Sequence, residues 1–239
     1  MTGTATVAPA RPGWLRAARW MARTQLRGAV WFWAFAGVLT AATLALNAAT
    51  VGVDASVAQY VGVVAPWFIV AMAILTTWRH LALHVVSGLT RRAFVGAAMV
   101  VGALVAVTYA GGAVVVLRLE GALFAVSGWP HVTGDGSAFD PGAEFTALFV
   151  PLALSFAAAH VSGLLVGLAY YRLGWWGTAT LPLTLAPYLL LGGDATGRWL
   201  PSSPDLHSAA GVSAALVVLA VGVLAARLLA RRTAIRAVA

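Results

Sequence analysis

The chain alternates long apolar stretches with short polar gaps, and this pattern predicts an all-α membrane protein. An α-helix of roughly 20 apolar residues is long enough to cross the hydrocarbon core of a bilayer. Six stretches reach this length, so we expect a polytopic domain over residues 29–230 with six transmembrane helices. They are placed near 29–49, 57–78, 93–115, 145–168, 175–192 and 210–230.

The segments that flank this domain are polar or amphipathic. Residues 1–12 are small, polar and contain proline, which predicts a disordered cytoplasmic tail, and residues 231–239 form a basic cytoplasmic tail. In residues 13–28, arginines recur every three or four positions between apolar side chains, which predicts an amphipathic helix in the membrane interface. The alternative is a basic flank that only orients the first span. The arginines are Arg16, Arg19, Arg23 and Arg27.

Charge divides between the two predicted faces of the membrane. All seven acidic residues fall in gaps on one face, and of the 15 basic residues only Arg118 and Arg198 share that face. Arginines near span ends are retained in the cytoplasm. The split therefore predicts cytoplasmic termini, and it assigns the net charge of +8 to a membrane face rather than to nucleic acid. Basic residues are all Arg in a chain rich in Ala, Gly and Val, which indicates a bacterial plasma membrane.

The composition excludes several classes of protein. Hydrophobic residues make up 61% of the chain and charged residues 9%, whereas a soluble domain has about a quarter charged residues. The chain has neither Cys nor Lys. A phosphate-binding Walker loop and a pyridoxal Schiff base both require lysine. We therefore predict that the chain is not an enzyme and has no cofactor, so that any ATP is bound by a partner subunit.

The candidate metal and catalytic groups match no known spacing. The gap at 116–144 contains four possible ligands, but Gly, Pro and Asp are also what a solvated loop needs. His80 and His84 lack a third ligand. His160 and Ser162 lie two residues apart on one helix and diverge, which argues against an intramembrane hydrolase. We predict neither a metal site nor catalytic residues. The four loop residues are His131, Asp135, Asp140 and Glu144.

Inside the predicted spans, His160 is the one clearly ionisable residue. An intramembrane ionisable group often marks a functional site, so His160 is either a substrate or gating contact or a structural hydrogen-bonding residue. No carboxylate lies in the spans, which argues against a carrier driven by protons or sodium. Small residues recur every fourth position in the same span and predict a close-packing face, within this chain or toward another subunit. They are Ser155, Ala159, Gly163 and Gly167.

The gap between the second and third spans, residues 78–94, is more structured than a simple turn. It predicts a short helix over 79–87 that ends at Gly88, because glycine tolerates the left-handed conformation that follows many helices. Thr90 is placed to cap the next helix. Two prolines in the fifth span, Pro182 and Pro187, and Pro66 in the second predict bends.

This gap resembles a motif in the membrane subunits of ABC-2 type transporters. The residues that match the motif are Gly88, Leu89, Thr90, Arg91, Arg92 and Phe94. Six spans, an amphipathic N-terminal helix and cytoplasmic termini match the layout of that family. One departure is that the family often has its most elaborate outer structure between the last two spans, whereas here the longer outer gap follows the third span. The resemblance implies a coupling helix that contacts a separate ATPase. The segment it assigns to this role is Arg79, His80, His84, Ser87, Gly88, Thr90, Arg91 and Arg92.

We therefore expect the permease subunit of an ABC-2 type exporter. Its partners would be the lipid bilayer, a separate ABC ATPase and a second permease subunit, identical or related, with the substrate passing between the two halves. The alternative is a non-transporting integral membrane protein, such as an assembly or immunity factor that binds another membrane protein.

Overall fold

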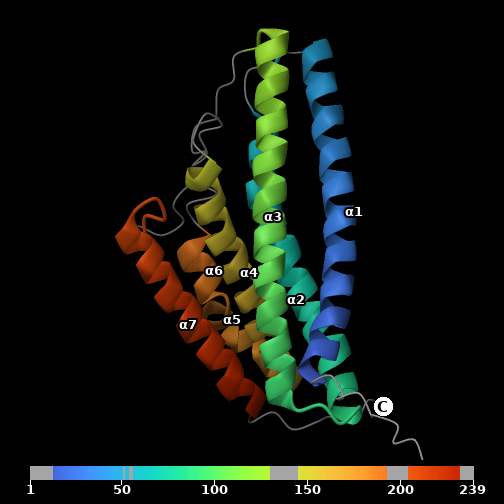
Figure 1. Cartoon of the computed structure of the whole chain (residues 1–239), viewed down its shortest axis with the longest axis vertical. Coiled ribbons are helices and arrows are strands. Elements are labelled where there is room, and N and C mark those ends of the chain that lie inside the picture. Colours follow the sequence, from blue (N-terminus) through green and yellow to red (C-terminus); the bar gives the residue numbers. More distant parts are fainter. Residues whose placement is uncertain (1–12, 51, 54–55, 130–144, 193–203, 232–239) are drawn as a thin grey trace, which may run out of the picture.

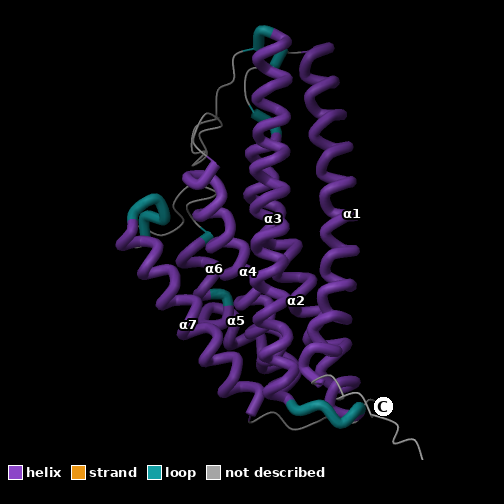
Figure 2. Tube along the Cα trace, viewed as in Figure 1, coloured by secondary structure: helices purple, strands orange, loops and turns teal. Residues whose placement is uncertain are grey.

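The protein is a bundle of long apolar helices, seen here in a computed structural model that describes residues 13–50, 52–53, 56–129, 145–192 and 204–231. Within these ranges it is all-helical and has no strand (Figure 1, Figure 2). The predicted tail 1–12, and all of the predicted tail 231–239 except Arg231, lie outside the described residues. The helices are α1 (Gly13–Thr50), η1 (Ala58–Tyr60), α2 (Val61–Val86), α3 (Arg91–Ser127), α4 (Phe145–Leu173), η2 (Gly174–Thr180), α5 (Leu181–Thr184), α6 (Ala186–Leu191) and α7 (Ala209–Arg231).

Five described helical segments are long and apolar enough to cross a membrane. This confirms the predicted all-α class and indicates an integral membrane protein. The prediction of six continuous spans is not confirmed. The five segments are Gly13–Thr50, Ala58–Val86, Arg91–Ser127, Phe145–Leu191 and Ala209–Arg231.

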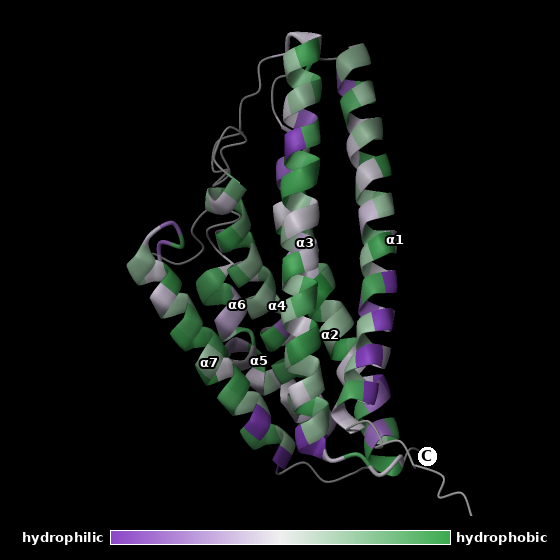
Figure 3. Ribbon diagram, in the orientation of Figure 1, coloured by the Kyte–Doolittle hydropathy of each residue, from purple (hydrophilic) through white to green (hydrophobic). Residues whose placement is uncertain are grey.

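The arginines of the described chain gather mainly at one end of the bundle, where α1 and α3 begin and where α2, α4 and α7 end (Figure 3). We call this the arginine-rich end. Described acidic residues are Glu120, near the other end of α3, and Asp205, four residues before α7. For the residues that the structure describes, the packing of the helices therefore separates most arginines from the two acidic residues, as the sequence predicted.

The predicted interfacial helix and first span are joined in one helix, α1, of 38 residues. A separate helix over 13–28 is therefore not confirmed. The physical reason is that its apolar face packs on protein: Ala17, Met21 and Gln25 are buried, while the four arginines are exposed. The helix continues through Gly28, where an added Cβ would stand 2.9 Å from the Met72 side chain, so the glycine allows close packing of α1 on α2.

The predicted fifth span, 175–192, is a broken element rather than one helix. It consists of η2, α5 and α6, which return along α4 from the arginine-rich end (Figure 1). Pro182 and Pro187 each lie in the first turn of a short helix, where proline's missing N–H costs no hydrogen bond. The prolines thus start new helical segments and do more than bend one continuous helix.

Helix α3 is longer than predicted. Residues 116–127 were assigned to a loop, but the helix continues through Arg118 and Glu120 to Ser127 and ends at Gly128, whose φ is +68°. Two charged residues in an apolar run suggest the end of a span, whereas Glu120 is buried against the start of η1, just before α2. The loop residues His131, Asp135, Asp140 and Glu144 lie outside the described residues.

Helix α4 forms the centre of the bundle and packs against α2, α3, α6 and α7. The small-residue stripe is confirmed as a packing face, and its partner is α2 of the same chain. A Cβ added at Gly163 would stand 2.5 Å from the backbone oxygen of Val70, and one added at Gly167 would stand 2.7 Å from Thr77 Cβ. Ser155 and Ala159 are buried on the same face.

Candidate functional site

The turn between α2 and α3 is fixed by backbone hydrogen bonds at the arginine-rich end. Gly88 has φ +81°; its N–H donates to Val85 O at 3.0 Å and the Leu89 N–H donates to His84 O at 3.0 Å, which is the Schellman motif. Thr90 Oγ1 accepts the Ala93 N–H at 3.1 Å and caps α3. Both predicted roles, for Gly88 and for Thr90, are confirmed.

The predicted short helix over 79–87 is not a separate element. Helix α2 continues without interruption to Val86, so this segment is its last two turns. No Gly or Pro lies between 67 and 87 to interrupt it. The turn that joins the two long helices is therefore only residues 87–90.

His80 and His84 lie inside the bundle and do not reach the surface of the turn. The His80 ring packs edge-on against Trp20 of α1, with ring centroids 3.8 Å apart, and the His84 ring packs edge-on against Phe94. His84 Nδ1 lies 2.8 Å from His80 O. The two histidines thus hold α1 and α3 against α2, because they stand on the inner face of the helix. Among the described residues, no three His, Asp or Glu side chains come close enough to hold a metal ion.

The remaining residues of the predicted coupling segment are accessible. Arg79, Ser87, Gly88, Thr90 and Arg92 are exposed, and Arg91 is half-buried. They form a cationic, hydrogen-bonding rim around the α2–α3 turn, and we call these six residues the turn surface.

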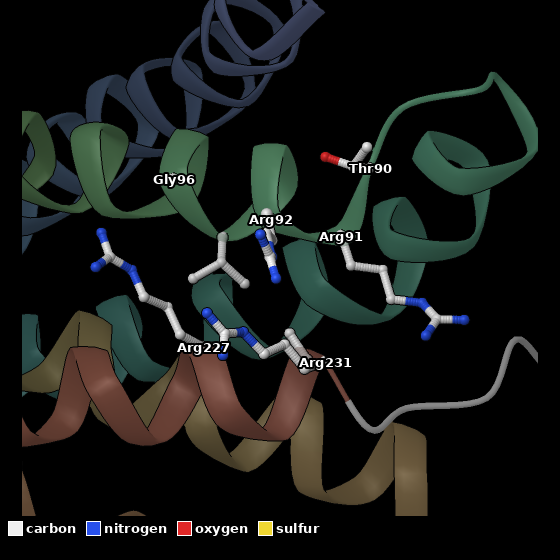
Figure 4. A pocket seen from close by; sticks show the side chains of 8 residues that line it. Thr90, Arg91, Arg92, Gly96, Arg227 and Arg231 are labelled. Carbon is white, nitrogen blue, oxygen red and sulfur yellow. The ribbon is translucent and has the colours of Figure 1, made fainter.

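A groove about 760 Å³ in volume opens beside this turn, between the first turns of α3 and the last turns of α7. Sequence reasoning missed it, because Arg227 lies in the predicted span 210–230 and Arg231 in the predicted basic tail, and only the packing of α7 on α3 brings them near Arg92. In Figure 4 the Arg92 and Arg231 side chains point toward each other, Arg227 extends from α7 toward α3 farther along the groove, and Arg91 points away. The lining residues are Thr90, Arg91, Arg92, Val95, Gly96, Arg227, Ala230 and Arg231.

His160 is buried in the centre of the bundle, where its Nε2 lies 3.1 Å from Ala98 O of α3. A Cβ at Gly102 would stand 2.4 Å from the ring, so the glycine makes room for the imidazole. Its Nδ1 has no hydrogen-bond partner. The ring borders a cavity of about 10 Å³ that also touches Gln25 and Thr76. The bond to Ala98 O is one that a structural residue makes; contact with a substrate or gate stays a prediction.

A second groove, about 500 Å³, lies between α1 and the start of α2, toward the end opposite the arginines. Its walls are mostly aromatic and aliphatic, with a few hydroxyl and amide groups. The residues that define it include Phe32, Phe35, Leu39, Thr43, Asn47, Tyr60 and Val64. We call it the apolar groove.

Comparison with protein-family models, with curated proteins and with solved structures found no match to this chain.

Proposed function

We propose that this protein is the membrane-spanning permease subunit of an ABC-2 type export system, driven by a separate ATPase. The observation that carries the proposal is the turn surface, a rigid cationic element continuous with α2 and α3. A partner that moves this turn also moves two long helices, because the Schellman motif and the Thr90 cap leave no flexible joint between them. Energy comes from the partner, since the chain has no lysine for a Walker loop.

Burial separates the residues of the proposed coupling segment into two groups. Of the residues assigned to coupling, His80 and His84 are buried against Trp20 and Phe94, so they support the turn from inside. The exposed Arg79 and the outward-pointing Arg91 are better placed to bind acidic groups of a partner. Arginine suits this role because its planar guanidinium can donate two hydrogen bonds to one carboxylate.

The substrate pathway in this proposal lies between two permease subunits. The apolar groove is open on the side of α1, whose exposed residues include Phe35, Val38 and Leu39. A second subunit packed near this side would enclose a path with apolar walls and scattered polar groups, which suits a hydrophobic or amphipathic molecule.

The proposed topology places the arginine-rich end in the cytoplasm and counts the broken segment 174–191 as a fifth crossing. Labelling of single cysteines tests the orientation cleanly, because the natural chain has none. Ser87→Cys, at the turn, should react with a membrane-impermeant maleimide only after the inner face is opened. Val126→Cys, at the far end of α3, should react in intact cells; the reverse pattern would refute the orientation.

The test of function is purification of the tagged chain from its native membranes in mild detergent, followed by measurement of ATP hydrolysis. We expect an ATPase to co-purify and Arg79→Glu with Arg91→Glu to remove it. Arg16→Glu with Arg19→Glu is the matched control, since it changes the same charge at exposed positions on α1. Recovery of the chain without ATPase activity would refute the proposal and favour the non-transporting alternative.

A further inference from the structure

The groove between α3 and α7 has the charge of an anion-binding site. Arg92, Arg227 and Arg231 line it from two helices, with Arg92 and Arg231 pointing toward each other (Figure 4), and none of its lining residues is acidic. The described acidic residues are too far away to neutralise this charge. Glu120 is 28 residues beyond Arg92 along α3, about 40 Å for a straight helix. Asp205 lies just before the first residue of α7, whereas the groove is at the last turns of α7. Guanidinium groups gathered in this way repel one another until an anion lies between them.

The backbone adds donors to this charge. Thr90 caps the Ala93 N–H, and the N–H groups of Arg91 and Arg92, in the first turn of α3, have no acceptor within the helix. The N-terminus of a long helix favours phosphate, because these N–H groups and the helix dipole both point to it. The carbonyl groups at the C-terminal end of α7 carry partial negative charge and disfavour an anion. Arg227 and Arg231 lie in the last two turns of α7 and offset this charge.

The groove is bordered by exposed apolar side chains, as expected for a site that faces lipid. Its floor is Val95, Gly96 and Ala230, and the helices continue from it with exposed apolar side chains. A volume of about 760 Å³ lies within the usual range for small-molecule sites. A ligand held here could place an anionic group among the arginines and a hydrocarbon chain along the bundle. The exposed residues beside it are Val100, Leu104, Leu224 and Leu228.

We propose that this groove binds a phosphate-bearing anion, supplied by the headgroup of an anionic phospholipid. Arg92, Arg227 and Arg231 hold the phosphate, the start of α3 donates backbone N–H groups, and the acyl chains lie along α3 and α7. Bound lipid would tie the end of α7 to the start of α3, beside the turn surface. The site does not depend on the proposed transport function, since it needs only a bilayer.

The test is lipid retention, measured by native mass spectrometry after the protein is moved from phosphatidylglycerol nanodiscs into detergent. We expect retained phosphatidylglycerol and no retained phosphatidylcholine. Arg92→Gln with Arg227→Gln and Arg231→Gln should lower retention about tenfold or more, since each arginine near an anionic surface contributes measurably to binding. The matched control, Arg16→Gln with Arg19→Gln and Arg23→Gln, removes the same charge from α1 and should retain the lipid.

A second variant fills the groove without changing any charge. A Cβ at Gly96 meets nothing within 4 Å, so Gly96→Leu should fold, occupy the groove and reduce lipid retention. Gly111→Leu, at another open position of α3, should retain it. Circular dichroism and melting temperature confirm folding in each case.

Three outcomes would show whether the phosphate comes from a lipid or a soluble ligand, and whether the proposal holds. Binding of inorganic pyrophosphate to the lipid-free protein, lost in the three-arginine variant, together with no retained phosphatidylglycerol, would overturn the lipid as the source and assign the site a soluble ligand. Equal loss of lipid in the α1 control would overturn the proposal, because general surface charge would then explain retention. Unchanged retention in the groove variants, with loss of a co-purified ATPase, would overturn it in favour of a protein-binding surface.

Discussion

The backbone N–H of Tyr188 in α6 donates a hydrogen bond to the hydroxyl of Ser162 in α4, over 3.0 Å. Tyr188 is the third residue of a helix that begins after a break, so its N–H has no acceptor within α6. A serine from a neighbouring helix therefore supplies the cap that Leu185, the residue before α6, cannot provide. Such compensation is needed in a membrane because no water is available to an interrupted helix.

Ser162→Ala should destabilise the protein by about 1 kcal/mol, the usual scale of a lost helix cap or interhelical hydrogen bond. The free energy of unfolding in bicelles, measured by steric trapping, checks this. Ser213→Ala is the control, since that exposed hydroxyl bonds only to Ala209 O in its own helix. Equal effects of the two substitutions would show that Ser162 does not support the break.

The broken segment illustrates what the sequence could and could not predict about the fold. Apolar length located the five long helical segments but not the number of spans, because crossing a bilayer requires about 20 apolar residues whatever surrounds them. It did not distinguish a continuous helix from η2, α5 and α6, since the stability of a break depends on Ser162, a residue on another helix. The extent of α3 was missed for a similar reason: Glu120 reads as a loop residue until its partners near residue 57 are known.

Gly163 should tolerate no side chain, although glycine normally weakens a helix. Its Cβ position lies 2.5 Å from Val70 O, a backbone atom that cannot move aside without shifting α2. Gly163→Ala should therefore cost about 1–3 kcal/mol of unfolding free energy through overpacking. Gly111→Ala, where a Cβ meets nothing within 4 Å, should instead gain up to about 1 kcal/mol from helix propensity. A loss at both positions, in the same unfolding measurement, would contradict this explanation.

Glu120 should stabilise the entry into α2 through its carboxylate. Its oxygens accept hydrogen bonds from the N–H groups of Val57 and Ala58, at 2.8 and 2.9 Å, and from the Ser56 hydroxyl. Glu120→Ala leaves these buried donors unpaired and should cost about 2–3 kcal/mol, whereas Glu120→Gln keeps one acceptor oxygen and should cost clearly less. Thermal unfolding of both variants in the same detergent measures the difference; equal losses would mean that the acceptor atoms do not matter.

The sequence predicted the candidate site correctly only where its structure depends on residues close by in the chain. Gly88 and Thr90 were assigned correctly because a helix end and a cap are set by local backbone geometry. His80 and His84 were placed on the partner-facing side, yet they are buried, because Trp20 and Phe94 approach from other helices. The groove between α3 and α7 could not be predicted either. It forms only because α7 packs on α3, and the pattern of residues within one helix does not say which helix packs on which.

The start of α1 is held by a buried polar contact that distinguishes a packed helix from one lying in the interface. Gln25 Nε2 donates to Thr76 Oγ1 of α2 at 2.9 Å, and both side chains are buried. A helix on the membrane surface would place Gln25 away from α2 and make no such contact. The energy that couples these two residues therefore reports where residues 13–28 lie.

A double-mutant cycle with Gln25→Leu and Thr76→Val should give a coupling energy of about 0.5–1.5 kcal/mol, the range found for interhelical hydrogen bonds in membranes. Unfolding free energies of the wild type, both single variants and the double variant supply the cycle. Gln25→Leu combined with Thr108→Val is the control, because Thr108 bonds Leu104 O in its own helix and the two changes should add. A coupling of zero between Gln25 and Thr76 would place the start of α1 away from α2 and restore the interfacial helix predicted from the arginine spacing.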